Sequence, residues 1–441
     1  MAERSADIRS APLPDVLAGP LLRRLLPQRI TLWLVGSRPL TLHLTLFDAA
    51  GQSFCEQRLD ASHCRTLAVG AHAFVHLIDL SLERALKEDA VFGYDLAIER
   101  DGQWQSIRQW APALCYGDEP YPRVKMSRQL DTLLHGSCRK PHCTSGDGLA
   151  RADRWLGERR DTPERWPSLL LMTGDQIYAD DVAGPMLVAI HRLIERLGLF
   201  SERFEGAELE DSDALLAEPH YYRREQLLPQ VEDNRDLRER FFSGKYKPVF
   251  TSAGAHNHLI TFAEAIAMYL LVWSPVPWSL IAVEQPALND EASARFDEER
   301  RAIEAFVTTL PQVRRVLAQL PSYMIFDDHD ITDDWNLTAA WETSAYEHPF
   351  SRRIIGNALI AYLLCQGWGN DPDAFRHADG GDHELMTALA AFCRAGDDGD
   401  DGHERDQGDL IDRLLAFERW HYTLPTPVSY THLTLPTIYS V

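Results

Sequence analysis

Three polar segments of the sequence contain side chains of the types that can bind metals and transfer protons, and they are residues 135–143, 173–181 and 327–336. Each segment follows a short apolar run that is typical of a buried strand, and helical patterns lie between the runs. Strands fed by helices favour parallel pairing in an α/β layered domain. Because functional groups collect just beyond the carboxyl ends of parallel strands, the sequence predicts that the three segments meet at one sheet edge.

The third segment carries five aspartates and one histidine within ten residues. These carboxylates would repel one another unless a cation or hydrogen bonds compensated their charge. A solvated acidic loop is the alternative interpretation. Because the segment comes straight off a buried strand, its side chains cannot all face water, and we favour the cation site.

The second segment begins with Gly174, which permits a sharp turn and places Asp175 at the sheet edge. An aspartate that caps the next helix is the alternative, but a cap does not explain Asp180 and Asp181. The first segment contains thiols and imidazoles but lacks the second Cys/His pair of a structural zinc site. A buried cysteine in a turn is the alternative for Cys138.

Taken together, the three segments resemble the PhoD-type alkaline phosphatases, which belong to the calcineurin-like metallophosphoesterases. The resemblance covers about residues 126–422. It rests on Ser137-Cys138, on Gly174-Asp175-Gln-Ile-Tyr178, and on Asp327-Asp328-His329-Asp330 followed by Asp334-Trp335-Asn336.

This resemblance implies a four-layer αββα domain that holds ferric iron with calcium, or alternatively two divalent transition metals. Asp175 is the implied bridging ligand, and Asp328 takes the place of the asparagine in the Gly-Asn-His-Glu motif of the wider superfamily. His329 would stabilise or protonate the leaving oxygen, and Arg139 would contact a phosphate oxygen. The implied metal ligands are Cys138, Asp175, Tyr178, Asp327 and Asp328.

The expected activity is hydrolysis of phosphate monoesters or diesters by a metal-activated hydroxide. The sequence also departs from the family, because no Gly-Asp-Val-His-type motif follows residue 336. Of the downstream histidines, His377, His383 and His403 lie in polar loops where we expect solvent exposure. His256 and His258 precede residue 336 and match no motif. A non-catalytic calcium-binding or interaction protein on the same fold is therefore the alternative. The sequence does not distinguish a monoesterase from a diesterase.

The composition argues against some classes of binding partner. The 441 residues carry a net charge of −22, so nucleic acid is a poor partner. An export signal is not evident at the N-terminus, and we expect a cytoplasmic protein. The uncharged stretch from Ala265 to Val283 is long enough for a membrane span, but Pro275 and Pro277 interrupt it. We expect a buried helix that ends near Trp273. The sequence leaves the oligomeric state open.

Alternating apolar residues predict antiparallel strands from Arg29 onward, and long helical patterns are scarce before residue 120. We therefore expect a β-sandwich over residues 1–122 and a metallophosphatase domain over residues 123–426, with a helical insertion at about 182–310. Residues 427–441 contain no Asp, Glu, Lys or Arg and resemble translated sequencing-adaptor DNA. We expect a foreign tail on a truncated domain, with a genuine terminal strand as the alternative.

Overall fold

The computed structural model describes residues 11–229, 249–250, 255–375, 381–395, 410–416, 420, 422–425 and 432–435. Its first part is built from two antiparallel sheets. The strands of sheet A, in spatial order, are β1 (Val16–Leu26), β2 (Arg29–Gly36), β6 (Ala73–Ser81) and β5 (Cys64–Gly70). Those of sheet B are β4 (Ser53–Arg58), β3 (Leu42–Phe47), β7 (Ala90–Arg100) and β8 (Gln103–Gln105). Strand β9 (Arg123–Met126) pairs with β7, so sheet B extends past residue 122.

The two sheets pack against each other and confirm the predicted sandwich. Leu42, Leu44 and Leu46 alternate with half-exposed residues along β3 and join a core with Ile30 and Leu32 of β2. Strand β2 differs from the expectation of one buried face, because its second face is buried as well. Trp33, on that second face, meets Trp273 edge-on with ring centroids 5.4 Å apart. Sheet A is therefore covered on both sides.

The second part contains a parallel sheet of three strands in the order β10 (Leu133–Gly136), β11 (Leu169–Thr173) and β12 (Ser322–Ile325). All three predicted strands are thus present and in register. Helix α3 (Gly148–Gly157) connects the first two strands. The connection from β11 to β12 holds α4 (Gly184–Leu197), α5 (Ser212–Ala217), α7 (Phe262–Trp273) and α8 (Asp290–Gln319).

The chain is therefore a mixed α/β protein with an N-terminal antiparallel sandwich. The four-layer αββα arrangement goes further than this observation. In the part of the chain that the structure describes, the only other paired strands after β12 are β13 (Tyr422–Pro425) and β14 (His432–Leu435). Of the expected foreign tail, 432–435 thus form a strand, and the rest of residues 427–441 lies outside the described residues.

Helix α7 explains the uncharged stretch of sequence. All twelve of its residues are buried, because sheet A, α4, α8 and α10 (Pro349–Tyr362) surround it. The helix ends at Trp273, as predicted, and Thr261 with Glu264 forms a capping box at its start. Within the described ranges, no helix is both long and apolar enough to cross a membrane.

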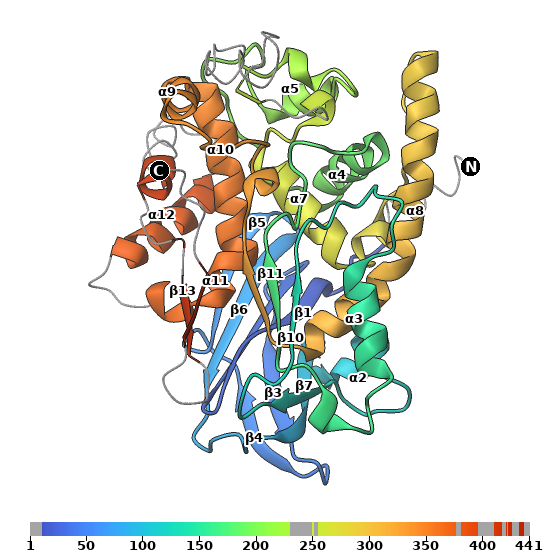
Figure 1. The fold of residues 1–441 in the computed structure, drawn as a ribbon, viewed down its shortest axis with the longest axis vertical. Coiled ribbons are helices and arrows are strands. Elements are labelled where there is room, and N and C mark those ends of the chain that lie inside the picture. The colour runs from blue at the N-terminus through green and yellow to red at the C-terminus, as the bar shows by residue number, and fades with distance from the viewer. Residues whose placement is uncertain are drawn as a thin grey trace.

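Later helices cover the other side of the parallel sheet. Figure 1 shows α10, α11 (Trp368–Asn370) and α12 (Gly381–Ala395) on one side of β11, with α3 and α8 on the other. A π-helical turn at Leu363–Gly367 joins α10 to α11. Helix α9 (Ala339–Glu347) precedes α10. Helix α2 (Ile107–Trp110) lies between β8 and β9 in the chain.

A buried arginine of the first strand makes several of the hydrogen bonds that join the two parts. Arg23 is fully buried and donates hydrogen bonds to the carbonyl of Ser322 on β12 and to those of Cys365 and Gln366. Its fourth bond, of 2.6 Å, goes to Oδ1 of Asn370. Burial lowers the pKa of Arg23 to about 10. The sandwich and the parallel sheet therefore share a buried polar contact.

Candidate metal centre

The ends of the three parallel strands carry the three polar segments, as predicted. Gly136 lies level with Met172, and Met172 lies level with Met324, so the next residues of each strand leave the same sheet edge. The amide of Cys138 donates to the carbonyl of Gly174 at 3.3 Å, and the amide of Arg139 donates to that of Asp175 at 2.9 Å. These bonds hold the first two loops together.

The loop after β11 has a strained backbone. Gly174 has φ of +115°, and a Cβ atom there would lie 2.3 Å from the Cβ of Asp327. Asp175 and Cys138 also have positive φ, of +52° and +56°, although neither is glycine. Left-handed non-glycine residues cost free energy and concentrate at functional sites, so this turn is a candidate site on geometry alone.

Asp330 fixes that turn from the third loop. Its buried carboxylate accepts hydrogen bonds from the amides of Asp175, Gln176 and Ile177, all at 2.8–2.9 Å, and from the amide of Asp327 at 3.1 Å. Burial raises the pKa of Asp330 to about 8, against the four N–H donors, which favour the ionised form. This one side chain thus positions the strand-end aspartates of β11 and β12.

The aspartates held in this way form a compact group of donor atoms. One carboxylate oxygen from each of Asp175, Asp327 and Asp328 lies within 4.8 Å of the others. The Sγ atom of Cys138 lies 3.1 Å from Oδ2 of Asp175. Asp328 also belongs to a second group with Asp333 and Asp334.

The electrostatics of this group fit a bound cation. Burial raises the pKa of Asp175 to about 6, and the Asp327 and Asp328 carboxylates add to the increase. Burial and the Asp175 charge also raise the pKa of Tyr178. The hydrogen bond with Ser137 lowers the pKa of the Cys138 thiol, but burial and Asp175 outweigh it.

A bound cation would offset these increases, because a nearby positive charge favours the ionised form of each group. In addition, the Oδ1 atom of Asp175 is buried and has no hydrogen-bond partner in the protein. Such an acceptor is costly to bury alone and is suited to ligate a metal. Carboxylates are ligands that calcium prefers, and a thiolate with a phenolate suits iron. The donor set fits a metal held by Cys138, Asp175, Tyr178, Asp327 and Asp328.

His329 lies at the edge of this group and is held from two sides. Its Nδ1 atom contacts Oδ2 of Asp180 at 2.9 Å, and its ring stacks on that of Tyr178 with centroids 4.7 Å apart. Burial lowers the pKa of His329, but the hydrogen bond and charge of Asp180 outweigh it and raise it to about 9. The Asp180 carboxylate therefore favours the protonated form of this imidazole.

Backbone hydrogen bonds connect the helical insertion to the loop of His329. The amide of Leu259 donates to the carbonyl of Ala179 at 2.6 Å, and the amide of Ala179 donates to that of His329 at 2.9 Å. Nε2 of His258 lies 3.1 Å from the hydroxyl of Thr332. His258, which matches no sequence motif, is thus a buried support of the acidic loop.

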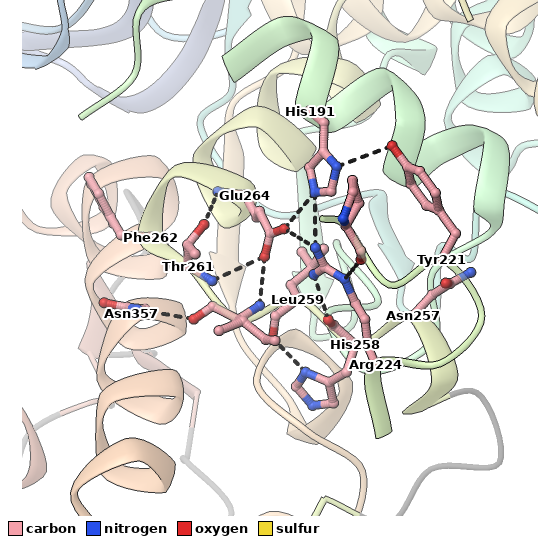
Figure 2. A network of polar contacts seen from close by, with 12 residues as sticks. His191, Tyr221, Arg224, Asn257, His258, Leu259, Thr261, Phe262, Glu264 and Asn357 are labelled. Atoms are coloured by element: carbon pink, nitrogen blue, oxygen red, sulfur yellow. Dashed lines mark hydrogen bonds and ion pairs between the residues drawn. The ribbon is translucent and has the colours of Figure 1, made fainter. Parts of the chain in front are cut away.

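A buried ion-pair network holds this supporting loop in place (Figure 2). Oε1 of Glu264 accepts from Arg224 at 2.6 Å and lies 2.7 Å from Nε2 of His191. Oε2 of the same carboxylate accepts from the amides of Ile260 and Thr261. Arg224 also donates to the carbonyl of His258 at 3.0 Å. The start of α7 and the loop before it are therefore tied together.

Arg139 is the predicted residue whose side chain the structure directs elsewhere. Its guanidinium pairs with Asp147 at 2.8 Å, donates to the carbonyl of Val272 at 2.6 Å and lies over the ring of Phe306. These partners secure α3 and the end of α7. Lys140 lies nearer the candidate ligands, with Nζ 5.7 Å from the centroid of the Tyr178 ring.

The structure thus brings together Cys138, Asp175, Tyr178, Asp327, Asp328 and His329. Sequence reasoning missed the roles of Asp330 and Asp180. Both stand inside the polar segments, but only long-range contacts distinguish them from their acidic neighbours. Of the downstream histidines, His377 and His403 lie outside the described residues. His383 lies in helix α12 and not in the polar loop that we expected, and its side chain is outside the described part.

Comparison with known families found no matching family model, and comparison with curated proteins found no match.

Proposed function

We propose that this protein is a metal-dependent phosphoesterase of the PhoD type, with the strand-end carboxylates as its metal site. The observation that carries the proposal is the convergence of Asp175, Asp327 and Asp328, with the thiol of Cys138, at one sheet edge. The unpartnered Oδ1 of Asp175 adds to it. The resemblance in sequence supplies the four-layer αββα domain as the proposed complete fold.

Bound metal ions, iron with calcium or two divalent transition metals, would neutralise the phosphate charge and activate a water molecule. The residues of the chain perform the remaining tasks. In this proposal His329, oriented by its hydrogen bond with Asp180, donates a proton from Nε2 to the leaving oxygen of the ester. Asp330 keeps the turn at Asp175 rigid, so the ligand positions are set before the metal binds.

Metal analysis and an activity screen test this proposal together. The protein is loaded with iron and calcium, and metal content is measured along with hydrolysis of one phosphomonoester and one phosphodiester. We expect bound metal and turnover that Asp175→Asn reduces at least tenfold. Asp161→Asn is the matched control, because Asp161 is an exposed aspartate away from the acidic group.

Two outcomes count against the proposal in different ways. Metal binding that depends on Asp175, without hydrolysis of either ester class, would favour the calcium-binding or interaction protein. The second acidic group at Asp328, Asp333 and Asp334 is the observation that favours this alternative. Equal activity of Asp175→Asn and Asp161→Asn would remove the assigned site altogether.

A further inference from the structure

A cavity of about 730 Å³ lies beside the candidate metal centre. Its walls come from the loop after β10 and from helices α3 and α8, which lie next to β10 in Figure 1. Cavities of 300–1,000 Å³ are typical of sites for small molecules. The volume therefore exceeds what a phosphate group alone would fill.

Apolar side chains form one part of the cavity wall, and charged side chains, among them Arg151, Glu298 and Arg301, form another. Leu134, Leu170 and Met172 line it from the parallel sheet, and Leu149 and Trp155 line it from α3. Phe306 lines it from α8. Apolar walls bind apolar groups by removing their surface from water, so they favour a ligand with an alkyl or aryl part over a sugar.

One side chain that lines the cavity has a buried oxygen without a hydrogen-bond partner in the protein. Gln176 is fully buried and donates from Nε2 to the carbonyl of Gly174 at 2.8 Å, but its Oε1 atom accepts no hydrogen bond within the protein. A buried acceptor without a donor is costly, and a ligand that brings an O–H or N–H group would satisfy it. This is an observation independent of the apolar walls.

The cavity and the metal centre share residues. Cys138 lines the cavity, and its Sγ atom lies 3.1 Å from the Asp175 carboxylate. Lys140 lines it as well and extends toward Tyr178. A phosphate group on a ligand in the cavity can therefore reach the acidic residues of the adjacent metal centre.

We infer that the cavity binds the alcohol part of the phosphate ester, and that this part is an apolar group with one hydrogen-bond donor near the ester. The inference rests on the proposed function for the identity of the ligand as an ester. It names a substrate class, esters of apolar alcohols, that the metal chemistry alone does not select.

Calorimetric titration with ethyl, butyl and hexyl phosphate tests the inference on the full-length, calcium-loaded protein. These esters share one reacting group and differ only in chain length. The dissociation constant should fall by up to about fourfold for each added methylene. The 2-hydroxyhexyl ester should bind about two- to tenfold more tightly than the hexyl ester, because it supplies a donor to Gln176.

A pair of variants locates the binding. Ala305 is exposed and lines the cavity from α8, so Ala305→Trp should fill its mouth and weaken hexyl phosphate binding at least tenfold. Thr308→Trp places the same bulk on an exposed position of the same helix that does not line the cavity, and it should leave the affinity unchanged.

Affinities that do not change with chain length would overturn the inference, as would equal losses in the two variants. Hydrolysis rates are recorded in parallel. Hydrolysis with a flat response to chain length refutes the apolar cavity and leaves the phosphoesterase proposal intact. Chain-length-dependent binding without any hydrolysis supports the cavity as a site for apolar phosphates and refutes the proposed catalysis.

Discussion

Replacing Glu264 with glutamine tests whether the network behind the site stabilises the protein. The change keeps the size of the side chain but removes its charge, and it leaves Arg224 buried without its carboxylate. Arg224 is fully buried, and the Glu264 side chain is 1% exposed, so water cannot compensate the loss. Breaking a buried ion pair from one side costs about 3–5 kcal/mol in the free energy of unfolding.

The pH dependence of this effect has a definite sign. Burial raises the pKa of Glu264, but Arg224 and His191 outweigh it and hold the pKa below its ordinary value of 4.5. A lowered folded-state pKa adds stability that is fully present above the unfolded value and is lost as the pH falls through the folded value. The gap between the wild-type protein and Glu264→Gln should therefore narrow as the pH falls below 4.5.

Guanidinium unfolding followed by tryptophan fluorescence, repeated from pH 7 to pH 3, measures both effects. Glu291→Gln is the matched control, because Glu291 lies in the first turn of α8 but is exposed, and its loss should cost less than about 1 kcal/mol. Arg224→Met in addition should recover part of the loss, because it removes the unpaired charge. A cost for Glu264→Gln no greater than that of the control would refute the reasoning.

Three further changes probe the site directly. Gly174→Ala should cost more than about 2 kcal/mol and weaken metal binding in calorimetry at least tenfold, whereas Gly136→Ala, with open space around it, should do neither. Asp330→Ala should speed hydrogen exchange of the four amides it binds, and unchanged exchange would contradict its anchoring role. Burial raises the pKa of Asp147, but Arg139 outweighs it and holds it below 3.8. That stability is present above pH 3.8 and lost below it, so Asp147→Asn should flatten acid unfolding there.

Local patterns in the sequence were sufficient to predict the helices and strands that have one clear hydrophobic periodicity. Alternation located β3, and the two prolines after Trp273 located the end of α7. The convergence of the polar segments was predictable because parallel strands end at the same edge. The burial of both faces of β2 was not predictable, because it depends on Trp273, which lies about 240 positions away. The role of Asp330 was equally unpredictable, because three of the four amides that it binds lie more than 150 positions away in the sequence.

The buried Arg23 sets an order on synthesis of the chain. A ribosome releases β1 first, yet the carbonyls that solvate its guanidinium belong to residues 299 to 343 positions later. Until those residues emerge, Arg23 must stay in water, and sheet A cannot close its second face. The two sheets of the sandwich can assemble early, but the second face of sheet A can be covered only after the residues that follow α10 have been synthesised. The nascent protein should therefore present the apolar face of sheet A to chaperones for most of its translation.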